Sequence, residues 1–218
     1  KSTLLETIAF RLQLPHMDGS DYSKKSFQAA VQLSSDLELE FNISRSRGFF
    51  FRAEDFGDYL NSVNRRDFVL HSQLKSLEGE VPEHIIQEMK ENANSQLHHM
   101  KKNYGQELGS FSHGEAYLKI IHEKIQDAGI YILDEPEAAL SPAKQLNLSY
   151  QILEHRKQNN SQFVIATHSP ILMAMPHATI FEITEDGMMQ TELESTVHYI
   201  ITKSFLNNPE AYLRHFTQ

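Results

Sequence analysis

The chain has 218 residues, of which 40% are hydrophobic, and this is enough apolar surface for a globular protein with a substantial core. Its formal net charge of -9 argues against tight nonspecific binding to nucleic acid, which needs a surplus of Lys and Arg. The lack of cysteine excludes disulfides and thiolate metal sites, and no apolar run is long enough to span a bilayer. We therefore expect a soluble, cytoplasmic protein without direct membrane insertion.

The first half of the chain predicts a helix followed by strands. Apolar residues at helical spacing predict a helix over 3–12. Alternation of apolar and polar side chains over 37–43 predicts a half-buried strand, and the three phenylalanines at 49–51 predict a second, more buried one. Residues 56–108 are polar, rich in histidine and helix-prone, so we expect a smaller helical subdomain there.

From residue 129 onward the pattern is that of a strand, a helix and a second strand. The apolar runs 130–133 and 163–166 are typical of strands, and the first has the continuous apolar character of a strand covered on both faces. Between them, Ser141 and Pro142 predict the start of a helix that ends near Gln158. In such a βαβ unit the two strands are parallel and the crossover is right-handed.

The C-terminal part of the chain predicts an antiparallel hairpin followed by two short helices. Strands are expected over 179–183 and 188–193, because the sequence EDG at 185–187 favours a tight turn between them. The tail over 196–216 has helical character on both sides of Pro209. The elements together predict an α/β fold.

Two adjacent carboxylates follow the first buried strand of the βαβ unit. Asp134 and Glu135 stand at its C-terminal end, where ligands bind in open α/β sheets. Neighbouring buried carboxylates repel one another unless a cation or a donor is present, and Mg²⁺ with a phosphate would supply that cation. The pattern favours Asp134 as a Mg²⁺ ligand and Glu135 as the group that orients or deprotonates an attacking water. The alternative is a strand that ends in a polar turn.

Two further segments carry groups that suit a phosphate. Ser112 to Glu115 have the spacing of a capping box, which by itself predicts only a well-capped helix. The same helix start, with Gly114, also presents free backbone N–H groups to an anion. His168 follows the strand that we expect beside the one carrying Asp134, so its imidazole could reach the same phosphate, although an isolated histidine after a strand is more often structural.

The order of the segments KST, SHGE, ILDEPEAALS and ATHSP resembles the ABC-type ATPases among the P-loop NTPases. It is similar in particular to the small stand-alone bacterial proteins described as AAA-family or ABC-like predicted ATPases. The resemblance implies one domain over 1–218 with a mostly parallel sheet flanked by helices, and within it a helical and signature subdomain over 56–128. It also implies ATP and Mg²⁺ as ligands and a homodimer with two sandwiched nucleotides.

The resemblance gives the first residues of the chain a role in nucleotide binding. Lys1, Ser2 and Thr3 match the end of the Walker A motif GxxxxGK[ST], with Lys1 on the β- and γ-phosphates and Ser2 on Mg²⁺. We expect this chain, as given, to lack the first strand and the Walker A glycines. Without them it could not cradle the phosphates with backbone amides.

The resemblance assigns the other motifs as well. Glu54 stands where the family has the glutamine of the Q-loop and could replace it near the metal, with a simple strand end as the alternative. The signature departs from that of transporters, which usually have Gly and Gln where this chain has His113 and Glu115. In this assignment Ser112, Gly114 and Glu115 belong to the signature, which contacts the γ-phosphate bound by the opposite subunit. Asp134 is the Walker B aspartate and Glu135 the catalytic glutamate. Residues 138–141 form the D-loop, and His168 is the switch histidine.

Three kinds of function are consistent with these motifs. The first is an ATPase whose ATP-bound form is a head-to-tail homodimer. The second is a nucleotide-gated binding module with slow hydrolysis and a protein partner. The third is an SMC-like ATPase that acts on DNA in repair or phage defence; it would be an arm-free one, because the 112 residues from Lys1 to Ser112 leave no room for long coiled-coil arms. A transporter subunit is a further alternative.

Overall fold

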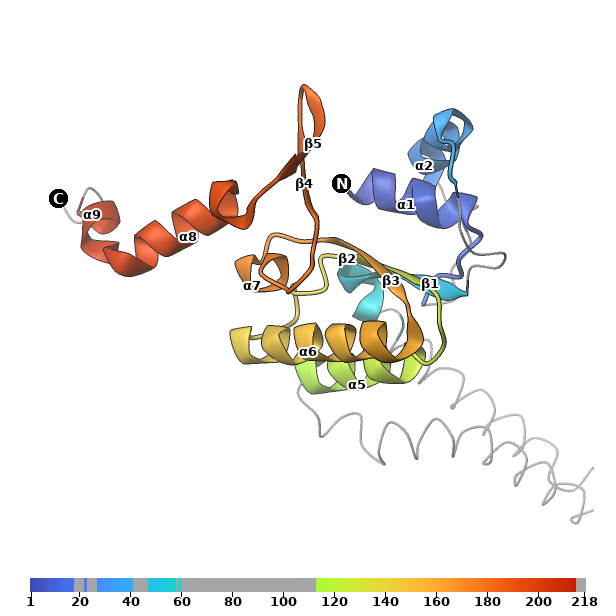
Figure 1. The fold of residues 1–218 in the computed structure, drawn as a ribbon, viewed down its shortest axis with the longest axis horizontal. Coiled ribbons are helices and arrows are strands. Elements are labelled where there is room, and N and C mark those ends of the chain that lie inside the picture. The colour runs from blue at the N-terminus through green and yellow to red at the C-terminus, as the bar shows by residue number, and fades with distance from the viewer. Residues whose placement is uncertain (18–21, 23–26, 41–46, 58, 60–112, 215–218) are drawn as a thin grey trace, which may run out of the picture.

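A three-stranded parallel sheet forms the centre of the molecule (Figure 1). Its strands are β1 (Gly48–Arg52), β2 (Ile130–Asp134) and β3 (Gln162–Ala166), and β2 lies between the other two. Every residue of β2 is buried, as expected for a strand covered on both faces. The computed structural model describes residues 1–17, 22, 27–40, 47–57, 59 and 113–214.

Helices cover the sheet on both faces (Figure 1). Helix α1 (Ser2–Arg11) packs on one face together with the short α2 (Gln28–Leu33). Helices α5 (His113–Lys124) and α6 (Pro142–Asn159) pack against each other on the opposite face. This three-layer arrangement confirms the predicted α/β class with a parallel sheet flanked by helices.

The alternation of side chains along the strands divides the core into two parts. Phe50 of β1 and Ile132 of β2 belong to the cluster on the side of α1, and both are fully buried. Phe51 and Leu133, one residue further along, belong to the larger cluster on the side of α5 and α6. Burying each such side chain contributes roughly 1.5–3 kcal/mol relative to leaving it exposed. The two apolar faces hold the strand ends in a fixed position.

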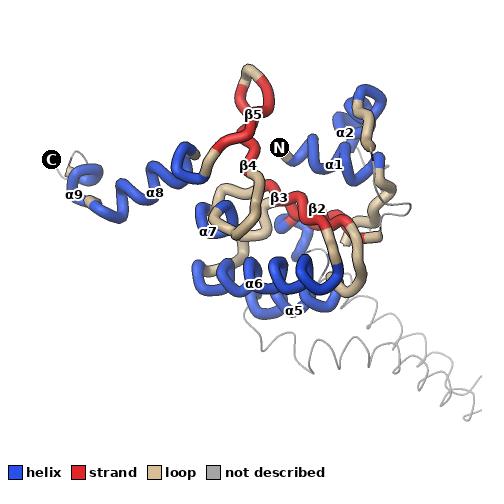
Figure 2. The backbone as a smooth tube through the Cα atoms, in the orientation of Figure 1, coloured by secondary structure: helices blue, strands red, loops and turns tan. Residues whose placement is uncertain are grey.

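The C-terminal part extends away from the sheet (Figure 2). After the short α7 (Pro170–Met173), the hairpin of β4 (Ile180–Thr184) and β5 (Gly187–Thr191) is antiparallel, as predicted. Helices α8 (Val197–Asn207) and α9 (Pro209–Leu213) follow. Many large apolar side chains of this part are exposed, namely Phe181, Ile183, Met188, Met189, Val197, Ile200, Ile201, Leu206, Tyr212 and Leu213.

In the first half of the chain, one predicted strand is wrong in its described part, and most of the predicted helical subdomain lies outside the described residues. The strand expected over 37–43 is wrong for its described part, since 37–40 is not in a strand. The backbone at Leu37 is extended, but it pairs with no strand among the described residues, because alternation favours extended backbone without supplying a neighbour. Most of the helical subdomain predicted over 56–128 lies outside the described residues, which resume with α5. No helix in the described ranges is long and apolar enough to cross a membrane.

Two glycines allow β1 and β2 to start side by side. The backbone of Gly48 has φ +137°, and a Cβ atom there would lie 1.7 Å from the carbonyl oxygen of Ile130. A Cβ on Gly129 would lie 2.3 Å from the carbonyl oxygen of Arg47. The close approach is fixed by a hydrogen bond of 2.7 Å from the Ile130 N–H to the Arg47 carbonyl. Any side chain at either glycine would separate the strands.

We predict that Gly48→Ala lowers the free energy of unfolding by at least about 3 kcal/mol, because it combines an unfavourable backbone conformation with a backbone clash. Gly57→Ala is the matched control, since a Cβ at Gly57 meets no atom within 4 Å, and it should change stability by less than about 1 kcal/mol. Urea unfolding of both variants measures the difference. Equal midpoints for Gly48→Ala and the wild type would contradict the close approach.

Candidate functional site

The C-terminal ends of the three strands meet at one edge of the sheet. In the parallel register Arg52 pairs with Asp134, and Asp134 pairs with Ala166. The residues that follow β2 and β3 therefore emerge next to each other. This edge brings together Asp134, Glu135 and His168, as the sequence predicted.

Asp134 is a buried carboxylate that lacks a full set of partners. Asp134 is only 3% exposed, and its Oδ1 has no hydrogen-bond partner among the described residues. Burial raises the pKa of Asp134, and the Glu135 carboxylate raises it further, while the approach of the Ser2 hydroxyl and the charge of Arg52 lower it. An unpartnered buried oxygen beside a hydroxyl suits a hard cation such as Mg²⁺. The residues present therefore fit the predicted metal.

The described residues contain no group of three or more His, Cys, Asp or Glu that could hold a metal by itself. This is compatible with Mg²⁺, which usually takes one or two carboxylates and completes its octahedron with water and substrate phosphates. Asp134 and the Ser2 hydroxyl would then be the protein ligands. Glu54, the third predicted ligand, is 71% exposed in its side chain and pairs with Arg52 at 2.9 Å, so Arg52 stands between it and Asp134.

Arg52 is a cation at this edge whose side chain is only 14% exposed, and the sequence did not single it out as a functional residue. Its guanidinium pairs with the carboxylate of Glu6 from α1, and its Nε lies 3.5 Å from Oδ2 of Asp134. Glu6 is 4% exposed, so both carboxylates depend on Arg52 for charge compensation. The arginine thereby links the first helix to the end of β2.

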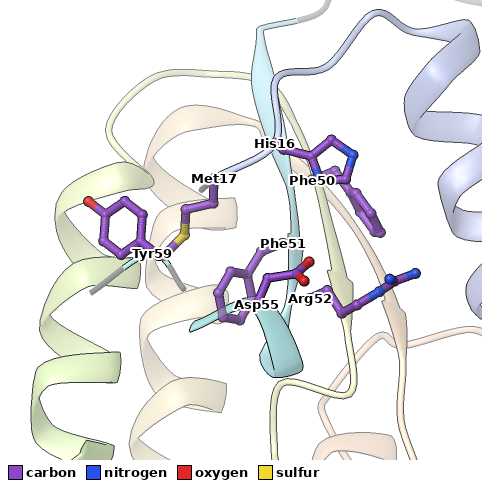
Figure 3. A pocket seen from close by; sticks show the side chains of 7 residues that line it. All are labelled: His16, Met17, Phe50, Phe51, Arg52, Asp55 and Tyr59. Atoms are coloured by element: carbon purple, nitrogen blue, oxygen red, sulfur yellow. The ribbon is translucent and has the colours of Figure 1, made fainter. Parts of the chain in front are cut away.

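A shallow depression lies beside the end of β1, and its lining residues come from both sides of the strand (Figure 3). In Figure 3 the side chains of Met17 and Tyr59 lie on one side of β1, whereas the Arg52 side chain extends to the other. Arg52 lines this depression and also pairs with the carboxylates of the edge. The depression is lined by His16, Met17, Phe50, Phe51, Arg52, Asp55 and Tyr59.

Glu135 turns the chain sharply at the end of β2. Its φ of +49° is left-handed, a conformation that costs energy in residues other than glycine and occurs at functional sites. Its N–H donates to the carbonyl of Ala166 at 2.9 Å, which continues the pairing of β2 with β3 by one residue. The carboxylate is half exposed, and its Oε1 lies 3.4 Å from Nε2 of His168. The turn thus presents the carboxylate to solvent beside the imidazole.

Glu137 fixes the segment that carries His168, a role that the sequence analysis missed. Its Oε1 accepts the backbone N–H of His168 at 2.6 Å. The next residue, Ser169, is buried and caps α7 by accepting the N–H groups of Ile171 and Leu172. His168 is therefore held by its own backbone N–H and by its anchored neighbour Ser169. An acidic residue two positions after Glu135 was the only sequence signal for this bond.

The first turn of α5 lies against the turn that follows Glu135. Gly114 is buried, and a Cβ there would lie 3.0 Å from the carbonyl oxygen of Ala139, in the predicted D-loop. Glu115 is exposed. Ser112 lies outside the described residues, so the capping box itself is not described. The structure therefore brings the second half of the predicted signature next to the D-loop.

The predicted Walker A residues stand at the start of α1. Lys1 is exposed and precedes the helix, and Thr3 is exposed in its first turn. Ser2 is half-buried and close enough to Asp134 to lower its pKa. Of these three residues, Ser2 has the clearest connection to the carboxylate edge.

A protein-family model matches residues 35–174, which include β1, α5, β2, α6 and β3. The family is described as "AAA domain, putative AbiEii toxin, Type IV TA system". The chain belongs to this family. Membership confirms the predicted resemblance to the AAA-family or ABC-like ATPases and the P-loop NTPase fold class, and it indicates a nucleotide-binding domain. No curated protein matches the chain.

We predict that Arg52→Met lowers the free energy of unfolding at pH 7 by about 3 kcal/mol or more, because it leaves two buried carboxylates without compensation. Part of this loss should return as the pH falls toward 5. The reason is that Asp134 has a raised pKa in the folded state, so the folded protein binds the proton more tightly than the unfolded chain does, and Arg52→Met raises that pKa further.

Urea unfolding with EDTA at pH 7 and pH 5 measures both effects. Arg47→Met is the matched control, because Arg47 pairs with Asp127 at 3.1 Å on the surface, with 73% and 65% of the two side chains exposed. It should cost less than about 1 kcal/mol. If the two variants lose equal stability at pH 7, Arg52 does not compensate buried charge.

Proposed function

We propose that this protein hydrolyses ATP with Mg²⁺ at the edge formed by the ends of β2 and β3. The observation that carries the proposal is the juxtaposition of Glu135 and His168, 3.4 Å apart, beside the buried and unpartnered Oδ1 of Asp134. A metal ligand, a base and a phosphate-facing imidazole are the groups that phosphoryl transfer to water requires. Membership of an AAA domain family supports the nucleotide as the ligand.

Each group has a distinct role in this proposal. Mg²⁺, when bound, neutralises charge on the β- and γ-phosphates and helps to align them. Asp134 and Ser2 hold the metal, and Lys1 contributes a positive charge to the phosphates. Glu135 orients the attacking water and accepts its proton. The Nε2–H of His168, which faces Glu135, transfers its hydrogen bond to the γ-phosphate, where negative charge must be stabilised in the transition state.

The same proposal includes a head-to-tail homodimer in which Ser112, Gly114 and Glu115 contact the γ-phosphate bound by the opposite subunit. The N-terminus of a helix carries a partial positive charge, and α5 begins at His113, directly after Ser112. Glu115 stands in its exposed first turn. Thr3 is the last Walker A residue in this assignment. Glu54 would reach the metal only if it exchanged its Arg52 partner for it.

We predict that Glu135→Gln in the full-length protein lowers kcat for ATP hydrolysis by about 10²- to 10⁴-fold, because an amide cannot accept the proton of the water. ATP binding and ATP-dependent dimerisation should persist, as seen by fluorescence titration and by light scattering. Glu210→Gln in the first turn of α9 is the matched control and should keep the wild-type rate. Normal turnover in Glu135→Gln would contradict the assigned base.

The family description supports a second, cellular proposal, namely that the ATP cycle drives a growth-inhibiting toxin. Induced expression of the wild-type protein should then slow bacterial growth. Expression of the Glu135→Gln variant at equal protein level should relieve the inhibition if turnover is needed. Undiminished growth with the active wild-type enzyme would contradict the toxin role without affecting the ATPase proposal.

A further inference from the structure

His198 lies against His168, although 30 positions separate the two residues in the sequence. The Nε2 atom of His198 is 2.9 Å from Nδ1 of His168, and the ring centroids are 4.7 Å apart with an angle of 70° between the planes. His198 stands in the first turn of α8. Helix α8 packs against α7, the helix that follows His168 in the chain. None of the sequence motifs includes His198.

The start of α8 is held in place, so His198 has a defined position. Thr196, which precedes the helix, is buried, and its Oγ1 accepts the N–H of Tyr199 at 3.4 Å. The same hydroxyl donates to the carbonyl of Leu193 at 2.8 Å. The cap thereby fixes the helical turn that carries His198.

The two contacts of His168 determine which of its nitrogens carries the proton. Nε2 faces the carboxylate of Glu135, which can only accept when ionised. A neutral His168 that donates from Nε2 must accept at Nδ1. The group at Nδ1 therefore has to be a donor, and the facing atom is Nε2 of His198. His198 with its proton on Nε2 completes a chain of donors that ends at Glu135.

The surroundings of His198 favour its neutral form. Burial lowers the pKa of His198, and the neighbouring His168 and the charge of Lys1 lower it further, against the opposite effect of Glu182 and Glu137. A neutral His198 donates from Nε2 without placing a second positive charge beside His168. With this donor at Nδ1, a neutral His168 carries its proton on Nε2, facing Glu135.

We infer that His198 is a positioning residue for His168: it donates from Nε2 to Nδ1 and thereby holds His168 in the Nε2–H tautomer, facing Glu135. The role in turnover rests on the proposed ATPase function. The tautomer itself does not, because both contacts are made between side chains of this chain. His198 touches neither the attacking water nor a phosphate in this scheme, so it acts only through His168.

The test compares His198→Phe with His198→Gln in the full-length protein. Phe keeps a ring for packing but cannot donate, whereas the side-chain amide of Gln places a donor near the position of Nε2. We expect His198→Phe to lower kcat about 5-fold with little change in KM for ATP, as for loss of one orienting hydrogen bond. His198→Gln should stay within about 2-fold of the wild type. His122→Phe on the exposed face of α5 is the control for the substitution.

A second measurement separates this inference from the proposed function. Long-range ¹H–¹⁵N NMR reports the tautomer of His168 without any turnover, and it should show the Nε2–H form in the wild type and in His198→Gln, and a loss of that preference in His198→Phe. An unchanged tautomer in His198→Phe, or equal kcat values for both variants, would overturn the role of His198. A wild type that shows the tautomer but never hydrolyses ATP would overturn the ATPase proposal alone.

Discussion

The joining of the ends of β2 and β3 by two hydrogen bonds is the constraint on which the site depends. The Glu135 N–H donates to Ala166, and the His168 N–H donates to Glu137, so each strand end holds the other. Backbone groups at such an edge would otherwise bond to water and leave the loops free to move. The two bonds fix the Glu135 carboxylate and the His168 imidazole relative to the sheet. The fully buried β2 supplies the rigid base.

The left-handed backbone at Glu135 follows from this constraint. If the chain continued as a strand beyond Asp134, the next side chain would stand on a face of the sheet and point into the core. The φ of +49° instead turns the carboxylate outward while its N–H keeps the pairing with β3. Such a conformation costs about 1–3 kcal/mol and persists only where the surroundings hold it. Here the bond to Ala166 and the turn bond from Ala138 to the Glu135 carbonyl hold it.

The sequence predicted the central elements well because local signals determine them. The strands β2 and β3 and the helix between them agree with their predicted ranges to within one residue, since a continuous apolar run and a Ser-Pro helix start depend on near neighbours only. The short helix α2 was missed because six residues give little periodicity, and part of the strand expected at 37–43 was wrong because a strand also needs a partner.

Within the site, the same reasoning found the residues with motif positions and missed those that act through distant contacts. Asp134, Glu135 and His168 follow strands and could be placed at one edge from topology alone. The partner of Arg52 on α1, Glu6, lies 46 positions earlier in the chain, and His198 lies 30 positions after His168. No local spacing relates such pairs, so only the packing of α1 and α8 reveals them. Patterns in a single sequence therefore do not reveal the polar residues that position another polar side chain or compensate its charge.

The charge balance of the edge supports the proposal that a metal and added cations take part in its function. Among the described residues, three carboxylates pair with the guanidinium of Arg52, namely those of Glu6, Glu54 and Asp134, and two more, those of Glu135 and Glu137, contact His168 at the same edge. A polyphosphate approaching this edge would meet like charge on most sides, and in a partly buried site that repulsion is weakly screened. Arg52 cannot offset it, because its guanidinium is already occupied by carboxylates. In the proposed ATPase, a divalent cation on Asp134 and the positive charge of Lys1 would make the edge attractive to a phosphate. In the proposed ATPase, Glu135 would have to exchange its contact with Nε2 of His168 for the attacking water.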